Sequence, residues 1–236
     1  PADSSYTDAF ILNIAEVGDT GSYIVFSSRS FSHGGEDQYQ ALSAQVFTST
    51  GAYQGTSSVI ANTASGSYLY GSGIEATSIG NDQIVVSWRE RDPEGGAGSI
   101  TTYMQRINAD GSLSGDALVL FESLSSIAEL EVHISEILAV GDQGNYIVRG
   151  VYSDNNNISN GFSELVKADG SIVSLHNDEV PTYRITTVGD DGSFVAAWNE
   201  SDDNGTDISV QLYDADGTPS GDTVSLEANA YSYDRD

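Results

Sequence analysis

Acidic side chains around a glycine are the first residues in this sequence whose types and spacing suit chemistry. The stretch from Asp202 to Asp207 holds three carboxylates and the amide of Asn204 around Gly205. Ca²⁺ takes about six to eight oxygen ligands of these kinds. The stretch therefore predicts a calcium site formed by Asp202, Asp203, Asn204 and Asp207. The alternative is a tight turn, because Asp and Asn favour turns and the stretch does not match the EF-hand loop.

The two tryptophans are the second set of candidates. Trp88 and Trp198 stand at equivalent places at the ends of two predicted strands, and acidic residues follow both. Large aromatic rings mostly pack in cores, which is the favoured interpretation, but they also form platforms on which ligands stack. The predicted ligand-binding residues are Trp88, Glu90, Asp92, Trp198 and Glu200.

The sequence contains none of the catalytic motifs considered below. The three histidines have no zinc-site spacing, and neither a Gly-x-Ser-x-Gly elbow nor a phosphate-binding loop occurs. Glycoside cleavage needs two carboxyl groups at a set distance, which a sequence does not show. We therefore expect a chain that is not an enzyme, and we rank a polysaccharide-cleaving propeller enzyme last.

The charge balance limits the partners. The 236 residues include 35 acidic and 8 basic side chains, which gives a formal charge of −27. Nucleic acid and anionic membrane surfaces require a basic footprint, so neither is expected as a partner. The acidity fits a cation-rich setting or bound Ca²⁺, and the alternative is a solvated surface that keeps the chain soluble. Without cysteine there is no disulfide or thiolate site, and no apolar run of about 18 residues spans a bilayer.

A repeat organises the whole chain. The first turn of each repeat begins at Val17, Ile79, Val140 and Val188. The second turn lies around a glycine in each unit: Gly51, Gly111, Gly170 and Gly217. Six residues before this glycine stands a polar residue, which is Gln45, Gln105, Glu164 or Gln211. Four residues after it stands a small residue, which is Gly55, Gly115, Ser174 or Gly221. This agreement predicts four tandem units, at about residues 6–62, 68–122, 126–177 and 180–229.

Each unit is predicted to be a four-stranded antiparallel meander, because the turns carry Gly and Asp, which tolerate positive φ. Four such units in one all-β domain, residues 1–236, favour a β-propeller-like fold, with a β-sandwich or barrel of hairpins as the alternative. Residues 126–139 suit a helix by pattern but a strand by repeat position, and we predict a strand. Residues 230–234 resemble residues 4–8, so we expect the chain to be part of a longer polypeptide.

Alternate turns of a meander lie at opposite ends, so the acidic segments after the second strands share one face. These segments are predicted as loops at residues 29–38, 89–98, 152–160 and 200–207. Variable loops on a rigid scaffold commonly bind ligands, so this face is the predicted binding face. The polar residue in each third strand is expected to bridge adjacent sheets.

The fourth unit, from Phe194–Trp198 through the acidic segment to Val210–Thr218, resembles a repeat of very large secreted bacterial proteins, the RTX-type adhesins. The resemblance implies a secreted or cell-surface location, frequent dependence on calcium, and an adhesive or ligand-binding role. The Gly-Gly-x-Gly-x-Asp nonapeptide of RTX calcium rolls is absent. We therefore expect a non-enzymatic module that binds an extracellular glycan or protein ligand without membrane insertion, or alternatively a structural spacer or scaffold.

Overall fold

The computed structural model describes residues 4–18, 21–33, 37–63, 67–69, 74–92, 99–122, 131–153, 159–175, 183–189, 191–202 and 205–226. All regular elements in these ranges are β-strands that form four antiparallel sheets. The all-β class and the four meanders predicted from the repeats are therefore confirmed. No helix in the described ranges is long and apolar enough to cross a membrane.

Each sheet corresponds to one sequence repeat. The first sheet is β1 (Ser4–Val17), β2 (Ser22–His33), β3 (Asp37–Phe47) and β4 (Tyr53–Asn62). The second is β5 (Tyr68–Leu69), β6 (Glu75–Ser78), β7 (Gln83–Asp92), β8 (Ser99–Asn108) and β9 (Leu113–Glu122). The third is β10 (Glu131–Val140), β11 (Asn145–Ser153), β12 (Ser159–Val166) and β13 (Ile172–Ser174). The fourth is β14 (Tyr183–Val188), β15 (Ser193–Asp202), β16 (Gly205–Tyr213) and β17 (Pro219–Leu226).

Two details differ from a uniform repeat. In the second sheet the first strand is split, so that both β5 and β6 pair with β7. In the third unit, β10 is a strand as predicted from its repeat position, and residues 126–130 lie outside the described ranges.

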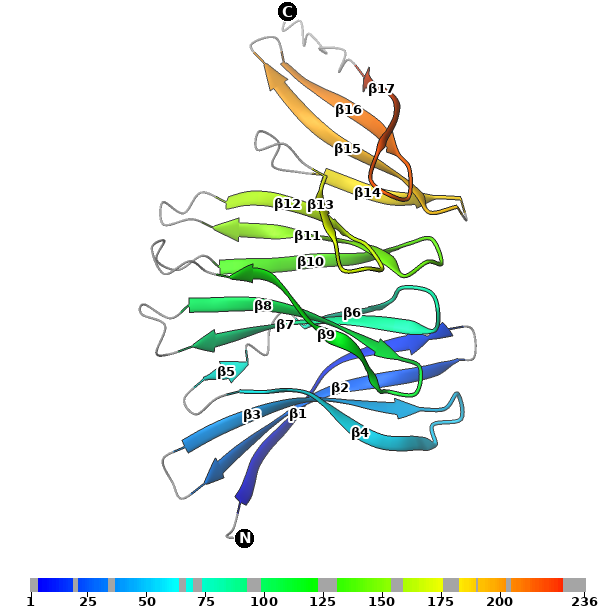
Figure 1. The fold of residues 1–236 in the computed structure, drawn as a ribbon. Coiled ribbons are helices and arrows are strands. Elements are labelled where there is room, and N and C mark those ends of the chain that lie inside the picture. Colours follow the sequence, from blue (N-terminus) through cyan, green and yellow to red (C-terminus); the bar gives the residue numbers. More distant parts are fainter. Residues whose placement is uncertain are drawn as a thin grey trace, which may run out of the picture.

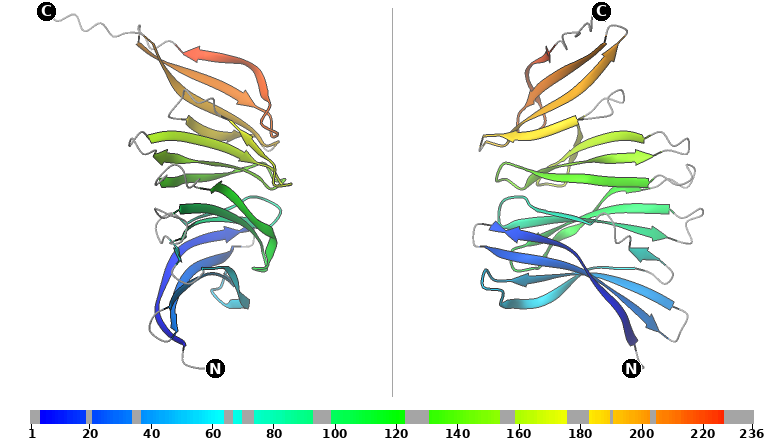
Figure 2. Two further views of the ribbon diagram at one scale, coloured as in Figure 1. Left: turned by 60° about the vertical axis from the view of Figure 1, so that its left-hand side comes forward. Right: turned by 180° about the vertical axis from the view of Figure 1, so that it is seen from behind.

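The sheets follow one another like the blades of a propeller that has not closed. Their first strands contact one another in order, β1 with β6, β6 with β10, and β10 with β14. The first and fourth sheets lie at opposite ends of the molecule in each of three views (Figures 1 and 2). The propeller-like arrangement is confirmed, and within the described residues it is an open array. We call the face that a sheet turns toward the following sheet its trailing face, and the opposite one its leading face.

Three apolar cores hold the array together, one at each junction between sheets. At the first junction, Phe26 and Leu42 on the trailing face of the first sheet pack against Trp88 and Ile107 on the leading face of the second. The second junction core includes Met104 and Tyr146, and the third includes Leu165 and Phe194. Alternation along the strands produces this pattern, because successive side chains point to opposite faces of a sheet.

The first turn of each unit is packed against the corresponding turn of the next. Gly80 has a φ of +82°, and a Cβ atom at this position would lie 2.8 Å from the carbonyl oxygen of Asp142. A Cβ on Gly141 would lie 3.0 Å from the Cα of Gly192 in the following unit. These glycines therefore serve both the turn conformation and the spacing between sheets.

The polar residues of the third strands do not bridge adjacent sheets, so that prediction is wrong. The amide of Gln105 instead donates to three backbone carbonyls of its own sheet, those of Arg106, Ser114 and Gly115, at 2.9, 3.2 and 3.2 Å. Gln45 and Gln211 make equivalent bonds. The cause is a register shift between the third and fourth strands, which removes carbonyls from the regular ladder.

The described parts of the acidic segments after the second strands are strand, not loop. β2 runs to His33, β7 runs to Asp92, and β15 and β16 pair as far as Asp202 opposite Gly205. The expectation of long loops at these places is corrected accordingly. Backbone pairing extends the hairpins because polar side chains are tolerated on strands that leave the core.

A candidate cleft between the third and fourth sheets

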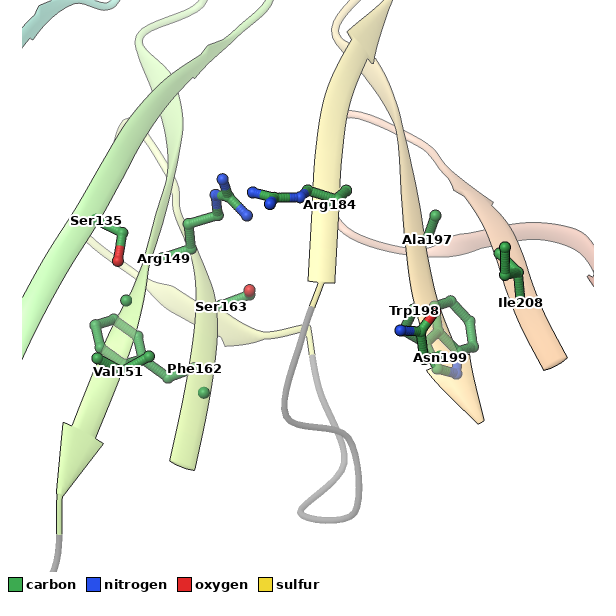
Figure 3. A pocket seen from close by; sticks show the side chains of 12 residues that line it. Ser135, Arg149, Val151, Phe162, Ser163, Arg184, Ala197, Trp198, Asn199 and Ile208 are labelled. Atoms are coloured by element: carbon green, nitrogen blue, oxygen red, sulfur yellow. The ribbon is translucent and has the colours of Figure 1, made fainter. Parts of the chain in front are cut away.

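A cleft of about 570 Å³ lies where the fourth sheet diverges from the third. Figure 3 shows it between β11 and β12 on one side and β14, β15 and β16 on the other. Its lining residues are Ser135, Arg149, Gly150, Val151, Gly161, Phe162, Ser163, Arg184, Ala197, Trp198, Asn199 and Ile208. We call it the Arg149–Arg184 cleft.

Local sequence explains why space remains at this junction. Among the described residues, the third junction core has fewer buried members than the other two. Several residues that line the cleft are small, among them Gly150, Gly161, Ser163 and Ala197. The sheets consequently meet through few large side chains and leave a cleft beside the core.

Two arginines dominate the charge of the cleft. Figure 3 shows the guanidinium groups of Arg149 and Arg184 facing each other across the gap between β11 and β14. Arg149 Nε donates to Glu136 Oε2, which partly neutralises it. Arg184 is exposed, and its side chain forms no hydrogen bond or ion pair with any residue in the described ranges. The cleft therefore has an unneutralised cation in a chain whose formal charge is −27.

Trp198, one of the predicted ligand-binding residues, lines this cleft, and Glu200, another, is hydrogen-bonded to it but does not itself line the cleft. The ring of Trp198 is partly buried and lines the cleft, and its Nε1 donates to Glu200 Oε1 at 2.8 Å. Asn199 lies between them in sequence and also lines the cleft. This part of the prediction is thus placed at one site.

Trp88, the repeat equivalent of Trp198, has a different role. It is 2% exposed and belongs to the first junction core, where it stacks on Tyr103 at a centroid distance of 5.3 Å. Its Nε1 has no hydrogen-bond partner in the described part of the chain. The ring is not accessible to a ligand, so Trp88 takes the core role that the sequence analysis favours.

Of the other predicted site residues, Glu90 and Asp207 have described side chains, and neither lines the cleft. Glu90 lies partly buried in β7 opposite Thr101, and Asp92 ends β7 with its side chain outside the described ranges. Asp202 ends β15, and its side chain, with Asp203 and Asn204, is likewise outside them. Asp207 lies opposite Glu200 in the hairpin of β15 and β16.

Calcium binding at Asp202–Asp207 stays a prediction. Among the described residues no group of three or more His, Cys, Asp or Glu is arranged to hold a metal ion. Three of the four predicted ligands have side chains outside those residues.

A second cleft, of about 600 Å³, lies between the second and third sheets. Its arginine, Arg106, is already engaged in packing. Arg106 lies 5.2 Å from the ring centroid of Tyr146 and donates from Nη2 to the Lys167 carbonyl at 2.7 Å. Burial raises the pKa of Tyr146 to about 12, against the opposing effect of Arg106. This cleft is part of the junction, whereas Arg184 in the Arg149–Arg184 cleft is available to a ligand.

Sequence reasoning missed both arginines. Arg149 sits in the second strand of its unit and Arg184 in the first strand of the next, so they are far apart in the repeat alignment. The available signal was their rarity, because the chain has only 8 basic residues. Arg149 and Arg184 come together only because the third sheet packs against the fourth, which the sequence does not show.

Comparisons with known proteins do not identify a family. No protein-family model matches the sequence, and no curated protein matches it. Among solved structures, the chain is similar to a thermostable family-43 glycoside hydrolase, with 10% identity and a TM-score of 0.35 over 93% of this chain and 96% of that chain.

That protein is an enzyme, whereas the sequence analysis predicts a non-enzymatic binding or adhesive module, or a spacer. The comparison contradicts this prediction, which is not carried further. At this TM-score the similarity assigns neither a family nor any site residue to this chain.

Proposed function

We propose that the chain acts on an acidic polysaccharide and seats a carboxylate-bearing sugar residue in the Arg149–Arg184 cleft. The observation that carries the proposal is the pair of facing guanidinium groups (Figure 3). Guanidinium groups bind carboxylates through two parallel hydrogen bonds, and an anion between two arginines relieves their mutual repulsion. Acidic polysaccharides are extracellular polymers, so the proposal includes the secreted or cell-surface location that the sequence resemblance implies.

The other lining residues suit a sugar. Trp198 offers a partly exposed aromatic ring, and Asn199 an amide that can both donate and accept hydrogen bonds. Ligand sites combine apolar and aromatic walls with a few polar groups that fix orientation. Sugar rings present both an apolar face and hydroxyl groups, so the two residues complement the anion-binding arginines.

Two carboxylates next to the cleft are the candidates for cleaving the bound polymer. Arg149 holds Glu136, and Trp198 holds Glu200, so each carboxylate is positioned by a side chain that lines the cleft. Glycoside hydrolysis commonly uses two carboxyl groups on either side of the scissile bond, one as acid and the other as base or nucleophile. Hydrolysis is therefore the reaction to test on the bound polymer.

The binding test compares polygalacturonate with the neutral glucan pullulan by isothermal titration calorimetry. We expect binding of the acidic polymer alone. Arg184→Gln should weaken it at least about tenfold, because a hydrogen bond to a charged partner contributes roughly 1.5–3 kcal/mol. Arg29→Gln, at an exposed arginine of the first sheet, is the matched control and should leave binding unchanged. Equal binding of both polymers, or no binding of either, contradicts the proposal.

Release of reducing ends from the same polymer tests cleavage. We expect Glu136→Gln and Glu200→Gln to abolish release while binding persists. A wild-type chain that binds polygalacturonate and releases no reducing ends contradicts the assignment of hydrolysis to these two residues, and leaves the cleft as a binding site only.

A further inference from the structure

The trailing face of the fourth sheet has no following sheet in the described part of the chain, although its side chains match those buried at the internal junctions. The residue before the first-turn glycine shows this most clearly. Val17 is 2% exposed, Ile79 0% and Val140 1%, because each packs into the junction with the next sheet. The equivalent Val188 is 45% exposed.

Two further positions on this face behave in the same way. Val46 and Leu165, in the third strands of the first and third sheets, are fully buried by the sheet that follows, whereas the equivalent Leu212 is exposed. Leu118 in β9 packs against the second junction core, whereas the equivalent Val224 in β17 is exposed. The trailing face of the fourth sheet thus has an apolar surface of the kind that the other junctions bury.

The turn contacts agree with this pattern. Gly80 and Gly141 lie against the first turn of the following unit. A Cβ atom on Gly189 would meet only Asp191 of its own turn among the described residues. The first turn of the fourth unit therefore has the same positive-φ glycine as the turns at the internal junctions, but no following turn packs against it in the described part of the chain.

The leading face of the first sheet has the complementary surface. Ile84, Tyr146 and Phe194 begin the second strands of the later sheets and are each at most 1% exposed. The equivalent Tyr23 is partly exposed and stacks on Phe47, as the buried Phe194 stacks on Tyr213. Ile14 and Tyr53 complete an exposed apolar surface around this aromatic pair.

We propose that the trailing face of the fourth sheet binds the leading face of the first sheet in a second copy of this chain. The contact continues the junction already used three times within the chain, with the same strand positions on both sides. It joins two different surfaces, so it generates either a ring or an open filament. By strand alternation, Arg184 and Val188 lie on the same face of β14, so the contact and the Arg149–Arg184 cleft share this strand.

Charge makes the association dependent on salt. Each copy carries a formal charge of −27, so two copies repel at low ionic strength. At about 0.5 M NaCl the Debye length is a few Å and this repulsion is screened. We therefore expect the complex to strengthen with salt, the reverse of an association driven by opposite charges.

Sedimentation velocity of the whole chain tests the proposal. The wild-type mass should rise from the monomer to at least the dimer as protein concentration and NaCl increase. Val188→Lys at one end and Ile14→Lys at the other should each reduce or prevent association, because every contact between copies needs one intact trailing face and one intact leading face. Leu113→Lys, at an exposed apolar residue of the second sheet, is the matched control and should associate like wild type. Circular dichroism checks that each variant is folded.

Two double variants give the decisive measurement. Val188→Lys/Leu212→Lys destroys the trailing face, and Ile14→Lys/Tyr53→Lys destroys the leading face. Each should be monomeric alone, and a mixture of the two should form a one-to-one dimer through the remaining intact faces. A wild-type chain that is monomeric under all conditions overturns the proposal. So do end variants that associate alone, or a mixture that does not form a dimer.

Discussion

At the scale of single residues, Glu164 departs from its repeat in a way that the structure explains. Gln45, Gln105 and Gln211 donate to carbonyls at a register shift between the third and fourth strands. A carboxylate cannot donate, and at Glu164 the third sheet has no such shift, because Glu164 lies directly opposite Ser174. In the third sheet, therefore, both the replacement of Gln by Glu and the loss of the register shift occur at the same position.

Glu164→Gln should stabilise the chain at neutral pH. Burial raises the pKa of Glu164, against a smaller lowering effect of its hydrogen bond with Ser174. The folded state therefore favours the protonated carboxyl, and stability is lost as pH rises through the folded pKa. We expect the variant to have a higher melting temperature than wild type at pH 7, with the difference shrinking toward about pH 4, where the unfolded carboxyl is also protonated.

The reciprocal change provides the control. Gln105→Glu removes three donated hydrogen bonds and places an acceptor beside backbone carbonyls. It should destabilise the chain at pH 7 by roughly 2–3 kcal/mol in urea unfolding. If both substitutions change stability in the same direction at pH 7, the explanation from register and burial is wrong.

The tryptophans show what residue type and spacing could not predict. Trp88 and Trp198 occupy the same repeat position, yet one is buried and the other lines a cleft. The difference comes from the preceding sheet, because Leu42 and Phe26 of the first junction core are replaced at the equivalent positions by Gly161 and Arg149, which line the cleft. A sequence pattern identifies the face on which a side chain lies, but not how closely the next sheet packs on it.

At the scale of elements, the sequence predicts the first and second turns of each unit, but not how far the strands extend at the end of the hairpins opposite those turns. The first and second turns contain glycines with positive φ, such as Gly18 and Gly111, which leave a clear signal in the sequence. The opposite ends of β2, β7 and β15 are polar, and the sequence analysis interprets them as loops. Their strand pairing depends on backbone hydrogen bonds, which carry no residue signature.

Two glycine substitutions separate the cost of turn conformation from the cost of sheet packing. Gly115 has a φ of +74°, and a Cβ atom added there would meet nothing within 4 Å, so Gly115→Ala introduces backbone strain alone. Gly80→Ala adds a collision with the Asp142 backbone in the next sheet. We expect losses of about 1 kcal/mol for Gly115→Ala and about 2–4 kcal/mol for Gly80→Ala in urea unfolding. Equal losses contradict a packing role for the first turn.

At the scale of the whole molecule, the open array makes stability local. In an array each sheet contacts only its neighbours, so stability is approximately a sum of sheet and junction contributions. Counted over the residues that the structure describes, the junction cores shrink along the chain, from the first through the second to the third. Within the described residues the fourth sheet has one small junction and one uncovered face, and it is therefore the least supported part of the array.

Hydrogen exchange measured by mass spectrometry should follow this gradient. We expect amides of β14–β16 to exchange faster than those of β2, β3, β7 and β8, because a weakly held sheet opens without global unfolding. Phe194→Ala removes the largest fully buried side chain on the fourth sheet and should accelerate exchange there, leaving the first sheet unchanged. Phe26→Ala, matched in type at the first junction, should accelerate exchange in the first two sheets instead. If either substitution accelerates exchange equally in all four sheets, the chain unfolds as one cooperative unit and the junctions do not act independently.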